Sequence, residues 1–221
     1  MKRSLRLRSG DSVTVADGSD RVYEVELTSV SSSFAEGQIV TQLHETGVMP
    51  DVWLVQGLPK GRQKADGIVR QTTEVGVGGI VFARTDRSNA SLPADRTAER
   101  IERWTRVARE AASQSRRIRV PSIHYHETLT SAVECLPPGC FMLVAREDES
   151  KTGLRESIKG IGAETRNVAV FVGPEGGFSE EEHAFLDSMN AHAFHMGATI
   201  LRTETAAVVA TALVRHELGL M

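Results

Sequence analysis

The sequence predicts an α/β domain preceded by a small β-rich module, and three observations carry this prediction. Between residues 5 and 42, apolar and polar residues alternate with period two, which is typical of half-buried strands. Gly47 and Pro50 then interrupt the pattern. From residue 52 onward, short apolar segments alternate with longer segments of helical periodicity, as in α/β proteins. We therefore place the module at residues 1–45 and the α/β domain at residues 46–221.

The expected elements follow from local patterns along the chain. In the module, residues 12–15 and 22–27 are expected to form strands joined by a turn at Asp17-Gly18, and a further strand starts near Gly37. In the α/β domain, apolar runs predict strands at residues 52–56, 79–83, 141–145, 168–172 and 193–196. Helical periodicity predicts helices at residues 64–75, 95–115, 180–190 and 205–218.

Composition excludes several classes of protein. The 221 residues are 40% hydrophobic and 25% charged, which argues against disordered and fibrous proteins. With only Cys135 and Cys140, the chain has no disulfide framework, which favours a reducing compartment. There is no apolar run of the about 20 residues that a membrane-spanning helix needs, and the basic N-terminus lacks the apolar stretch of a signal peptide. We therefore expect a soluble cytoplasmic protein that has no contact with membranes.

Charge is distributed unevenly, although the net charge is only −3. Residues 1–9 carry four basic and no acidic side chains, and residues 96–119 carry eight arginines against three glutamates. Residues 173–221 carry seven acids against Arg202 and Arg215. The basic segments favour either a face that attracts phosphate backbones or a solvated surface with local ion pairs, such as Glu99–Arg103 at helical spacing.

The first informative motif is a glycine-rich loop between an apolar strand and a helix, at residues 173–178. Ser179 and Glu182 have the spacing of a capping box, which predicts that the helix begins there. Ligands of α/β sheets bind at the carboxyl ends of strands, and glycines allow their close approach. The loop has neither the phosphate-loop nor the dinucleotide-binding pattern. A tight strand-to-helix turn without a ligand is the alternative.

The second motif is the segment 195–209, in which Arg202 and Glu204 follow an apolar loop and precede an alanine-rich helix with a threonine cap. One interpretation is a buried ion pair of Arg202 with Glu204 or Glu175. The other is that Arg202 grips an anionic or carbonyl-bearing substrate.

Together, GPEGGFSEEE and MGATILRTETAAVVATAL resemble the RsmE family of SPOUT-class RNA methyltransferases, as do residues 71–77, 84–88 and 110–116. The resemblance implies S-adenosylmethionine as cofactor and methylation of N3 of one uridine in 16S ribosomal RNA of the small ribosomal subunit. It also implies a homodimer, an α/β domain with a C-terminal trefoil knot, and a PUA-like β-barrel that binds RNA in the N-terminal module. Leu5–Asp11 resembles the middle of that barrel, so we expect the barrel to be incomplete in this chain, and Gln71 replaces the usual lysine.

The resemblance further implies the residues of the site. The cofactor is expected to contact two segments and a strand behind them: Val172, Gly173, Gly177, Met196, Gly197, Ile200, Leu201, Leu143 and Val144. Arg202 is the candidate for stabilising negative charge on uracil O2 and O4, and Glu175 or Glu204 for accepting the N3 proton or orienting Arg202. Phosphate contacts are expected from Arg6, Arg8, Arg87, Arg116 and Arg117, with Gln114 nearer the base.

No metal is expected. His124, His126, Cys135 and Cys140 are potential zinc ligands, but their spacing matches no familiar zinc finger and Pro137-Pro138 lies between the cysteines.

Two alternatives remain open: a noncatalytic RNA-binding or ribosome-assembly protein that retains the fold, and a SPOUT enzyme that methylates a ribose 2′-hydroxyl. Tight S-adenosylmethionine binding would speak against the first, and the position of the methyl group would decide the second.

Overall fold

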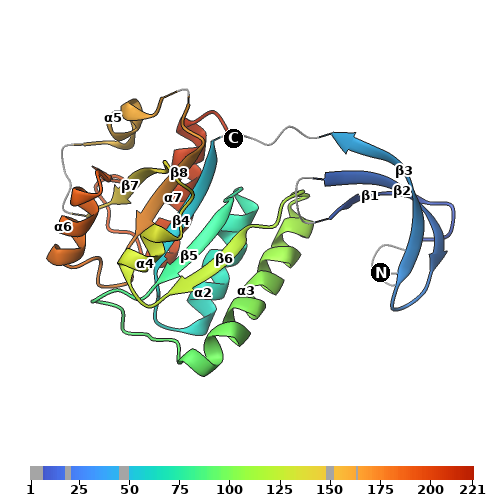
Figure 1. Cartoon of the computed structure of the whole chain (residues 1–221), viewed down its shortest axis with the longest axis horizontal. Coiled ribbons are helices and arrows are strands. Elements are labelled where there is room, and N and C mark those ends of the chain that lie inside the picture. Colours follow the sequence, from blue (N-terminus) through green and yellow to red (C-terminus); the bar gives the residue numbers. More distant parts are fainter. Residues whose placement is uncertain (1–6, 18–20, 45–49, 148–151, 163) are drawn as a thin grey trace. The chain divides into compact units, whose positions relative to one another are not determined.

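A computed structural model shows two compact units, residues 1–47 and residues 48–221 (Figure 1). It describes residues 7–17, 21–44, 50–147, 152–162 and 164–221. Each unit is described by itself below.

The described part of the first unit is an antiparallel sheet in the order β1-β2-β3. Its strands are β1 (Ser12–Ala16), β2 (Arg21–Val30) and β3 (Ala35–His44). The two strands expected around residues 12–27 are therefore present, whereas Gly18 of the expected turn lies outside the described residues. Val22 and Leu27 are the buried apolar residues of this unit, while Phe34, Ile39 and Val40 are exposed.

The second unit is built on a parallel sheet of six strands in the order β6-β5-β4-β8-β7-β9. The strands are β4 (Asp51–Gly57), β5 (Gly79–Ala83), β6 (Ser122–His126), β7 (Phe141–Ala145), β8 (Asn167–Val172) and β9 (His192–Phe194). In the centre, Leu54 of β4 is level with Ile80 of β5 and Val170 of β8. This confirms the expected α/β fold with a parallel sheet.

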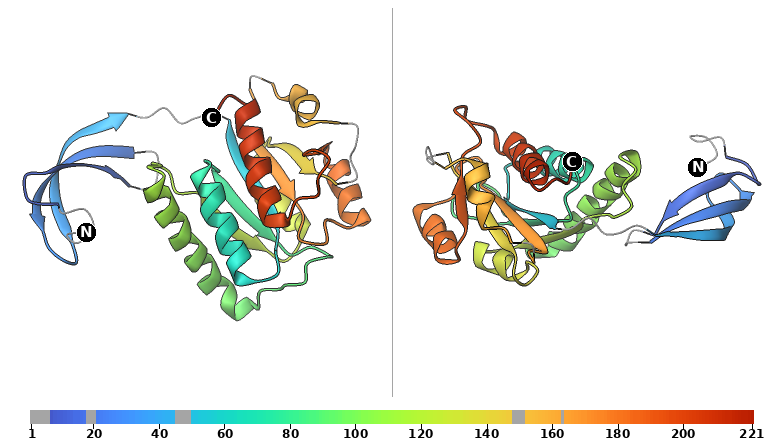
Figure 2. Two further views of the ribbon diagram at one scale, coloured as in Figure 1. Left: turned by 180° about the vertical axis from the view of Figure 1, so that it is seen from behind. Right: turned by 90° about the horizontal axis from the view of Figure 1, so that it is seen from above.

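Helices cover both faces of this sheet (Figures 1 and 2). One face packs against α2 (Arg62–Glu74), α3 (Ala94–Gln114) and α7 (Thr203–Glu217), and the other against α4 (Leu129–Glu134) and α6 (Glu180–Ser188). The short α5 (Leu154–Ser157) and a 3₁₀ turn (Ile158–Gly160) precede β8. Neighbouring strand residues such as Leu54 and Val55 enter opposite cores, which explains why these strands are apolar throughout.

The sequence patterns missed β6 and α4, as well as the short α5 and the 3₁₀ turn that follows it. Strand β6 is absent from the expectations because its sequence, SIHYH, is too polar for an apolar-run criterion. It lies at the sheet edge, where Ile123 and Tyr125 are buried and alternate residues are less covered. Helix α4 has six residues, too few to show helical periodicity, and begins at a Thr128 cap whose hydroxyl accepts a hydrogen bond from Ser131 N–H.

Helix starts were predicted correctly in one case and wrongly in another. At α6, Ser179 and Glu182 form the expected capping box. At α7, however, the helix begins at Thr203 after Arg202, and no side chain caps it. The expected threonine cap is therefore wrong, because the Thr203 hydroxyl donates a hydrogen bond to the Gly173 carbonyl instead, at 2.6 Å.

Within the described residues, no helix has both the length and the apolar character needed to cross a bilayer.

Candidate active site

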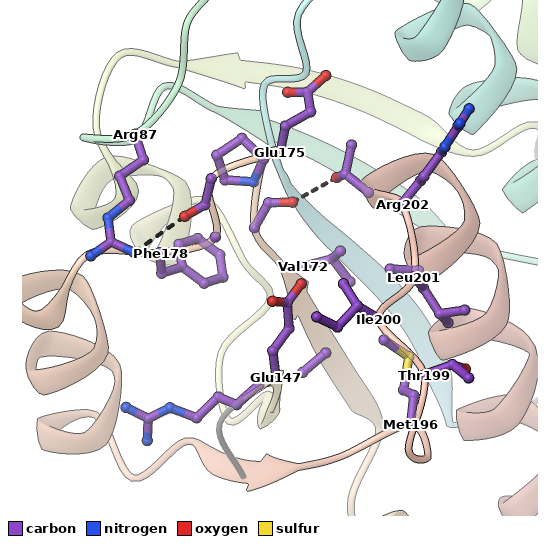
Figure 3. A pocket seen from close by; sticks show the side chains of 18 of the residues that line it. Arg87, Glu147, Val172, Glu175, Phe178, Met196, Thr199, Ile200, Leu201 and Arg202 are labelled. Carbon is purple, nitrogen blue, oxygen red and sulfur yellow. Dashed lines mark hydrogen bonds between the residues drawn. The ribbon is translucent and has the colours of Figure 1, made fainter.

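The centre of the sheet is a topological switch point. From β4 the chain continues to β5 and β6 on one side, whereas β8, β7 and β9 lie on the other. Loops that leave the carboxyl ends of β4 and β8 therefore diverge and open a crevice, which is where α/β sheets bind ligands. A cavity of about 640 Å³ lies there (Figure 3). Residues 145–147, 172–178 and 196–203 supply most of its wall, and the rest comes from Lys64, Arg87, Glu180, His183 and Ala206.

The glycine-rich loop at residues 173–178 leaves no room for side chains at its base. A Cβ atom on Gly173 would lie 2.8 Å from the Gly177 Cα atom, and Gly177 has a φ of +68°. The Gly177 N–H donates to the Pro174 carbonyl at 3.0 Å, which closes the turn. Glycine is thus required both for the turn and for the close approach of its two ends.

Gln56, at the end of β4, ties the two loops of the cavity together. Its side chain is fully buried, and its amide Nε2 lies 3.1 Å from the Gly173 carbonyl and 2.9 Å from Thr203 Oγ1. Because Gly173 follows β8 and Thr203 begins α7, this one amide positions both sides of the cavity. Sequence reasoning missed Gln56, although a polar residue at the end of the apolar run VWLV was a usable signal.

A second residue missed by sequence reasoning is Lys64, in the first turn of α2. Its Nζ atom lies 2.6 Å from Glu175 Oε1 and 3.7 Å from Glu204 Oε2. The hydrogen bond to Glu175 raises the pKa of Lys64. Partial burial by itself would raise the pKa of Glu175, but hydrogen bonds from Lys64 and the Lys60 N–H outweigh it and hold that pKa below its usual value. Glu175 is therefore an ionised carboxylate committed to Lys64.

Lys64 takes the place that the sequence suggested for Arg202 in an ion pair with Glu175 or Glu204. Among the described residues, Arg202 makes no ion pair, and it is exposed at the rim of the cavity (Figure 3). The buried ion pair expected for Arg202 is therefore wrong for the isolated chain. The cause is strand order, because pairing β4 with β8 brings the start of α2 to Glu175.

A polar latch joins the loop after β5 to the start of α6; it consists of Asp86, Arg87, Ser179 and Glu182. The buried Glu182 carboxylate accepts hydrogen bonds from the Asp86 N–H at 3.0 Å and the Ser179 N–H at 2.8 Å. Ser179 Oγ donates to Asp86 Oδ2 at 2.7 Å. Arg87 Nη1 donates to the Gly176 carbonyl at 3.2 Å, and this bond is drawn in Figure 3. The latch thus joins the glycine-rich loop and the start of α6 to the loop after β5.

Comparisons with known proteins show the family to which this chain belongs. The family model described as RNA methyltransferase domain matches residues 47–215. The ribosomal RNA small subunit methyltransferase E of Mycobacterium bovis is 30% identical to this chain over 93% of the chain and 78% of its own length. The chain belongs to this methyltransferase family.

Two further proteins are similar to nearly the whole length of this chain. The protein of the same name from Bacillus subtilis is 28% identical over 98% of this chain and 86% of its own length. A crystal structure of the Neisseria gonorrhoeae ribosomal RNA small subunit methyltransferase E, bound to S-adenosylmethionine, superposes with a TM-score of 0.80. It is 25% identical and covers 97% of this chain and 86% of its own. The resemblance found in the sequence motifs is therefore confirmed.

The methyltransferase cavity brings together most of the residues expected to contact a cofactor. These are Val172, Gly173, Gly177, Met196, Gly197, Ile200 and Leu201, and Glu175 and Arg202 line it as well. Leu143 and Val144 do not, because β7 is an interior strand and both side chains are fully buried beneath helices. Residues Ala145, Arg146 and Glu147, at the carboxyl end of β7, line the cavity in their place.

The residues expected to contact RNA are scattered in the methyltransferase. Arg6 lies outside the described residues, and Arg8 is exposed in the first unit. Arg87 lines the cavity. Gln114 and Arg116 are exposed where α3 ends, and because α3 runs back along the parallel sheet, this end lies at the amino edge of the strands, opposite the cavity.

Arg117 is bound to the protein itself, so the expectation that it contacts phosphate is not supported. Its Nη1 atom donates to the Thr73 carbonyl at 2.9 Å. Burial, and next the like charge of Arg215, lowers the pKa of Arg117 to about 10. Arg117 therefore joins the end of α3 to the end of α2.

The cysteines of the methyltransferase are both free, and burial raises the pKa of Cys140 to about 12. Across the part of the chain that the structure describes, no group of three or more His, Cys, Asp or Glu residues is arranged to hold a metal ion.

Proposed function

We propose that this methyltransferase transfers a methyl group from S-adenosylmethionine to N3 of a uridine in 16S ribosomal RNA of the small ribosomal subunit. The observation that carries the proposal is the cavity at the switch point, walled by the glycine-rich loop and by residues 196–203. The family membership supports the reaction and the RNA class, and the S-adenosylmethionine-bound Neisseria gonorrhoeae structure supports the cofactor.

The residues of the cavity fit this cofactor. Val172, Met196, Ile200 and Leu201 offer apolar surface for an adenine ring, and the adjacent loop backbones offer N–H and C=O groups for its polar edge. The missing side chain at Gly177, where a Cβ atom would meet no other atom within 4 Å, leaves space for a ligand beside the loop. When bound, S-adenosylmethionine supplies a methyl group on a sulfonium, whose sulfur keeps the electron pair of the broken bond.

The chain's own residues align uridine N3 with the methyl group and accept the proton that N3 loses. Uridine N3 carries a weakly acidic proton that must leave as N3 forms its bond to the methyl carbon, and negative charge spreads onto O2 and O4. Arg202 is exposed and belongs to the cavity lining, which supports a role for its guanidinium in stabilising this charge. Glu175 is hydrogen-bonded to Lys64, whereas Glu204 Oε2 forms only a looser ion pair with Lys64, at 3.7 Å, and has no hydrogen-bond partner. Glu204 is therefore the candidate proton acceptor, although it does not itself line the cavity.

We further propose the trefoil knot, the PUA-like fold of the first unit, the homodimer and the cytoplasmic location that the motifs suggest. The bonds joining Thr203 to Gly173 and Gln56 support close interlocking of the C-terminal segments. Ile200, at the cavity, is 79% exposed, and Leu213 of α7 is also exposed. Exposed apolar side chains are typical of interaction surfaces, so Ile200 and Leu213 support a homodimer in which a second copy of the chain covers them.

Methyl transfer from labelled S-adenosylmethionine to small ribosomal subunits that lack the modification tests the proposal. We expect nucleoside mass spectrometry to show N3-methyluridine with the native protein and a loss of at least about a hundredfold in rate with Arg202→Ala. A 2′-O-methylated nucleoside would indicate the ribose enzyme instead. Cofactor binding without transfer to any subunit preparation would support the noncatalytic RNA-binding alternative.

A further inference from the structure

The start of α2 and the facing side of α3 carry a cationic tract that consists of Lys60, Arg62, Arg96 and Arg100. Arg96 and Arg100 belong to the basic segment noted in the sequence, whereas Lys60 and Arg62 join it only in the folded chain. Lys60 and Arg62 lie at the amino end of α2, whose first turn contains no acidic residue. Arg96 and Arg100 lie one turn apart on α3, which packs beside α2 (Figure 2). Within the described residues, none of the four side chains forms an ion pair.

Two acids act on the tract from α2 and α3: Glu99, which precedes Arg100 on α3, and Asp66, which is already paired. Asp66 is buried in α2, and Arg103 of α3 binds it through both Nε, at 3.2 Å, and Nη2, at 2.6 Å. This pair joins the two helices and leaves Arg100 to face Arg62. Burial and then the like charge of Arg62 lower the pKa of Arg100.

Arg100 is also held in a defined position. Its guanidinium carbon lies 5.8 Å from the centre of the Trp104 ring, and Trp104 is fully buried. A cation supported in this way loses little freedom when it binds an anion.

The tract reaches the rim of the cavity. The Lys60 N–H donates to the Glu175 carboxylate at 3.1 Å, and Glu175 and Lys64 both line the cavity. The backbone of Lys60, where the tract begins, therefore lies beside the cavity, and the other three cations follow on α2 and α3. A polyanion bound along them would have one end at the site of methyl transfer.

We propose that Lys60, Arg62, Arg96 and Arg100 bind backbone phosphates of the RNA strand that carries the target base. This inference rests on the proposed function and adds the path of the RNA to it. It locates the phosphate contacts beside the cavity, whereas Gln114 and Arg116 lie at the opposite edge of the sheet. Phosphate contacts of this kind supply salt-dependent affinity and not base selectivity.

The test compares two charge-matched variants of the full chain, Arg100→Gln and Arg109→Gln. Arg109 is also exposed on α3 but lies nine positions further, half a turn around the helix from Arg100. Binding of a labelled 16S ribosomal RNA fragment is measured by fluorescence anisotropy over a range of salt concentrations. We expect Arg100→Gln to weaken binding severalfold and to reduce the salt slope by about 1, and the double variant Arg62→Gln/Arg100→Gln by about 2.

Several controls separate this inference from folding defects and from the proposed function. Arg100→Lys keeps the charge and should retain most of the salt slope, and all variants should bind S-adenosylmethionine as the native protein does. Equal slopes for Arg100→Gln and Arg109→Gln, with the native protein still forming N3-methyluridine, would overturn the tract and leave the function standing. A salt slope reduced in Arg100→Gln but not in Arg109→Gln would support the tract. If the native protein at the same time formed no N3-methyluridine, the proposed function would be overturned.

Discussion

At the scale of single residues, Lys64 links the glycine-rich loop of the cavity to α2, a contact that neither motif indicated. Lys64 Nζ lies between the carboxylates of Glu175 and Glu204, and the Lys60 N–H adds a further bond to Glu175. Glu175 therefore stays ionised and its loop stays close to α2. Arg202 follows in the same cavity lining and forms no ion pair within the described residues.

Lys64→Met removes this link, and we expect methyl transfer to fall at least about tenfold because the glycine-rich loop loses its contact with α2. The ion pair is partly exposed, so the free energy of unfolding should fall by less than about 1 kcal/mol at pH 7. Activity and urea unfolding check these two effects. Lys64→Arg is the control that keeps the charge; activity of Lys64→Met equal to that of the native protein would contradict this role.

The same pair sets the direction of a pH effect. The pKa of Glu175 is lower in the folded protein, so its contribution to stability is present above the ordinary carboxyl pKa and is lost as the pH falls through the lowered value. The stability difference between the native protein and Lys64→Met should therefore shrink from neutral to acidic pH. Urea unfolding at both pH values measures this change.

At the scale of elements, the latch of Asp86, Arg87, Ser179 and Glu182 explains why a loop after β5 matters to a cavity at β8. These strands are not neighbours, since β4 lies between them. The Glu182 carboxylate serves both the capping box of α6 and the Asp86 N–H. One buried side chain thus begins a helix and fastens two loops.

Glu182→Ala should lower the free energy of unfolding by about 1–3 kcal/mol, because it leaves two N–H groups without their acceptor. We also expect S-adenosylmethionine binding to weaken severalfold, since the glycine-rich loop directly precedes the cap. Urea denaturation and isothermal titration calorimetry measure the two effects. Glu181→Ala, at the adjacent exposed position, should change neither; equal behaviour of the two variants would argue against the latch.

Elements were predictable where their signal is local. The strands at 79–83 and 141–145 match the structure, and the capping box marked the start of α6, because an apolar run or a cap depends on adjacent residues. Strand β6 and helix α4 were missed because an edge strand needs few apolar residues and a six-residue helix shows no periodicity. The start of α7 was misplaced because Thr203 bonds to a distant carbonyl.

At the scale of the whole molecule, the cavity belongs entirely to the second unit, since all its lining residues lie between Lys64 and Ala206. We therefore expect residues 48–221 alone to bind S-adenosylmethionine within about twofold of the full chain. Their affinity for 16S ribosomal RNA should be lower, because the first unit carries Arg8 and the other basic residues near the N-terminus. Calorimetry with the cofactor and anisotropy with RNA test this; loss of cofactor binding in a folded fragment would show that the first unit contributes to the cavity.

The sequence by itself determined the α/β class, the glycine-rich loop, the arginine of the second motif and the family, because each depends on residues close together in the chain. The tertiary structure alone decided which distant residues meet. The order β6-β5-β4-β8-β7-β9 joins Lys64 to Glu175 and Gln56 to Gly173, buries Leu143 and Val144, and commits Arg117 to Thr73. Strand order is set by the packing of the whole sheet between its helices, and no local pattern encodes it.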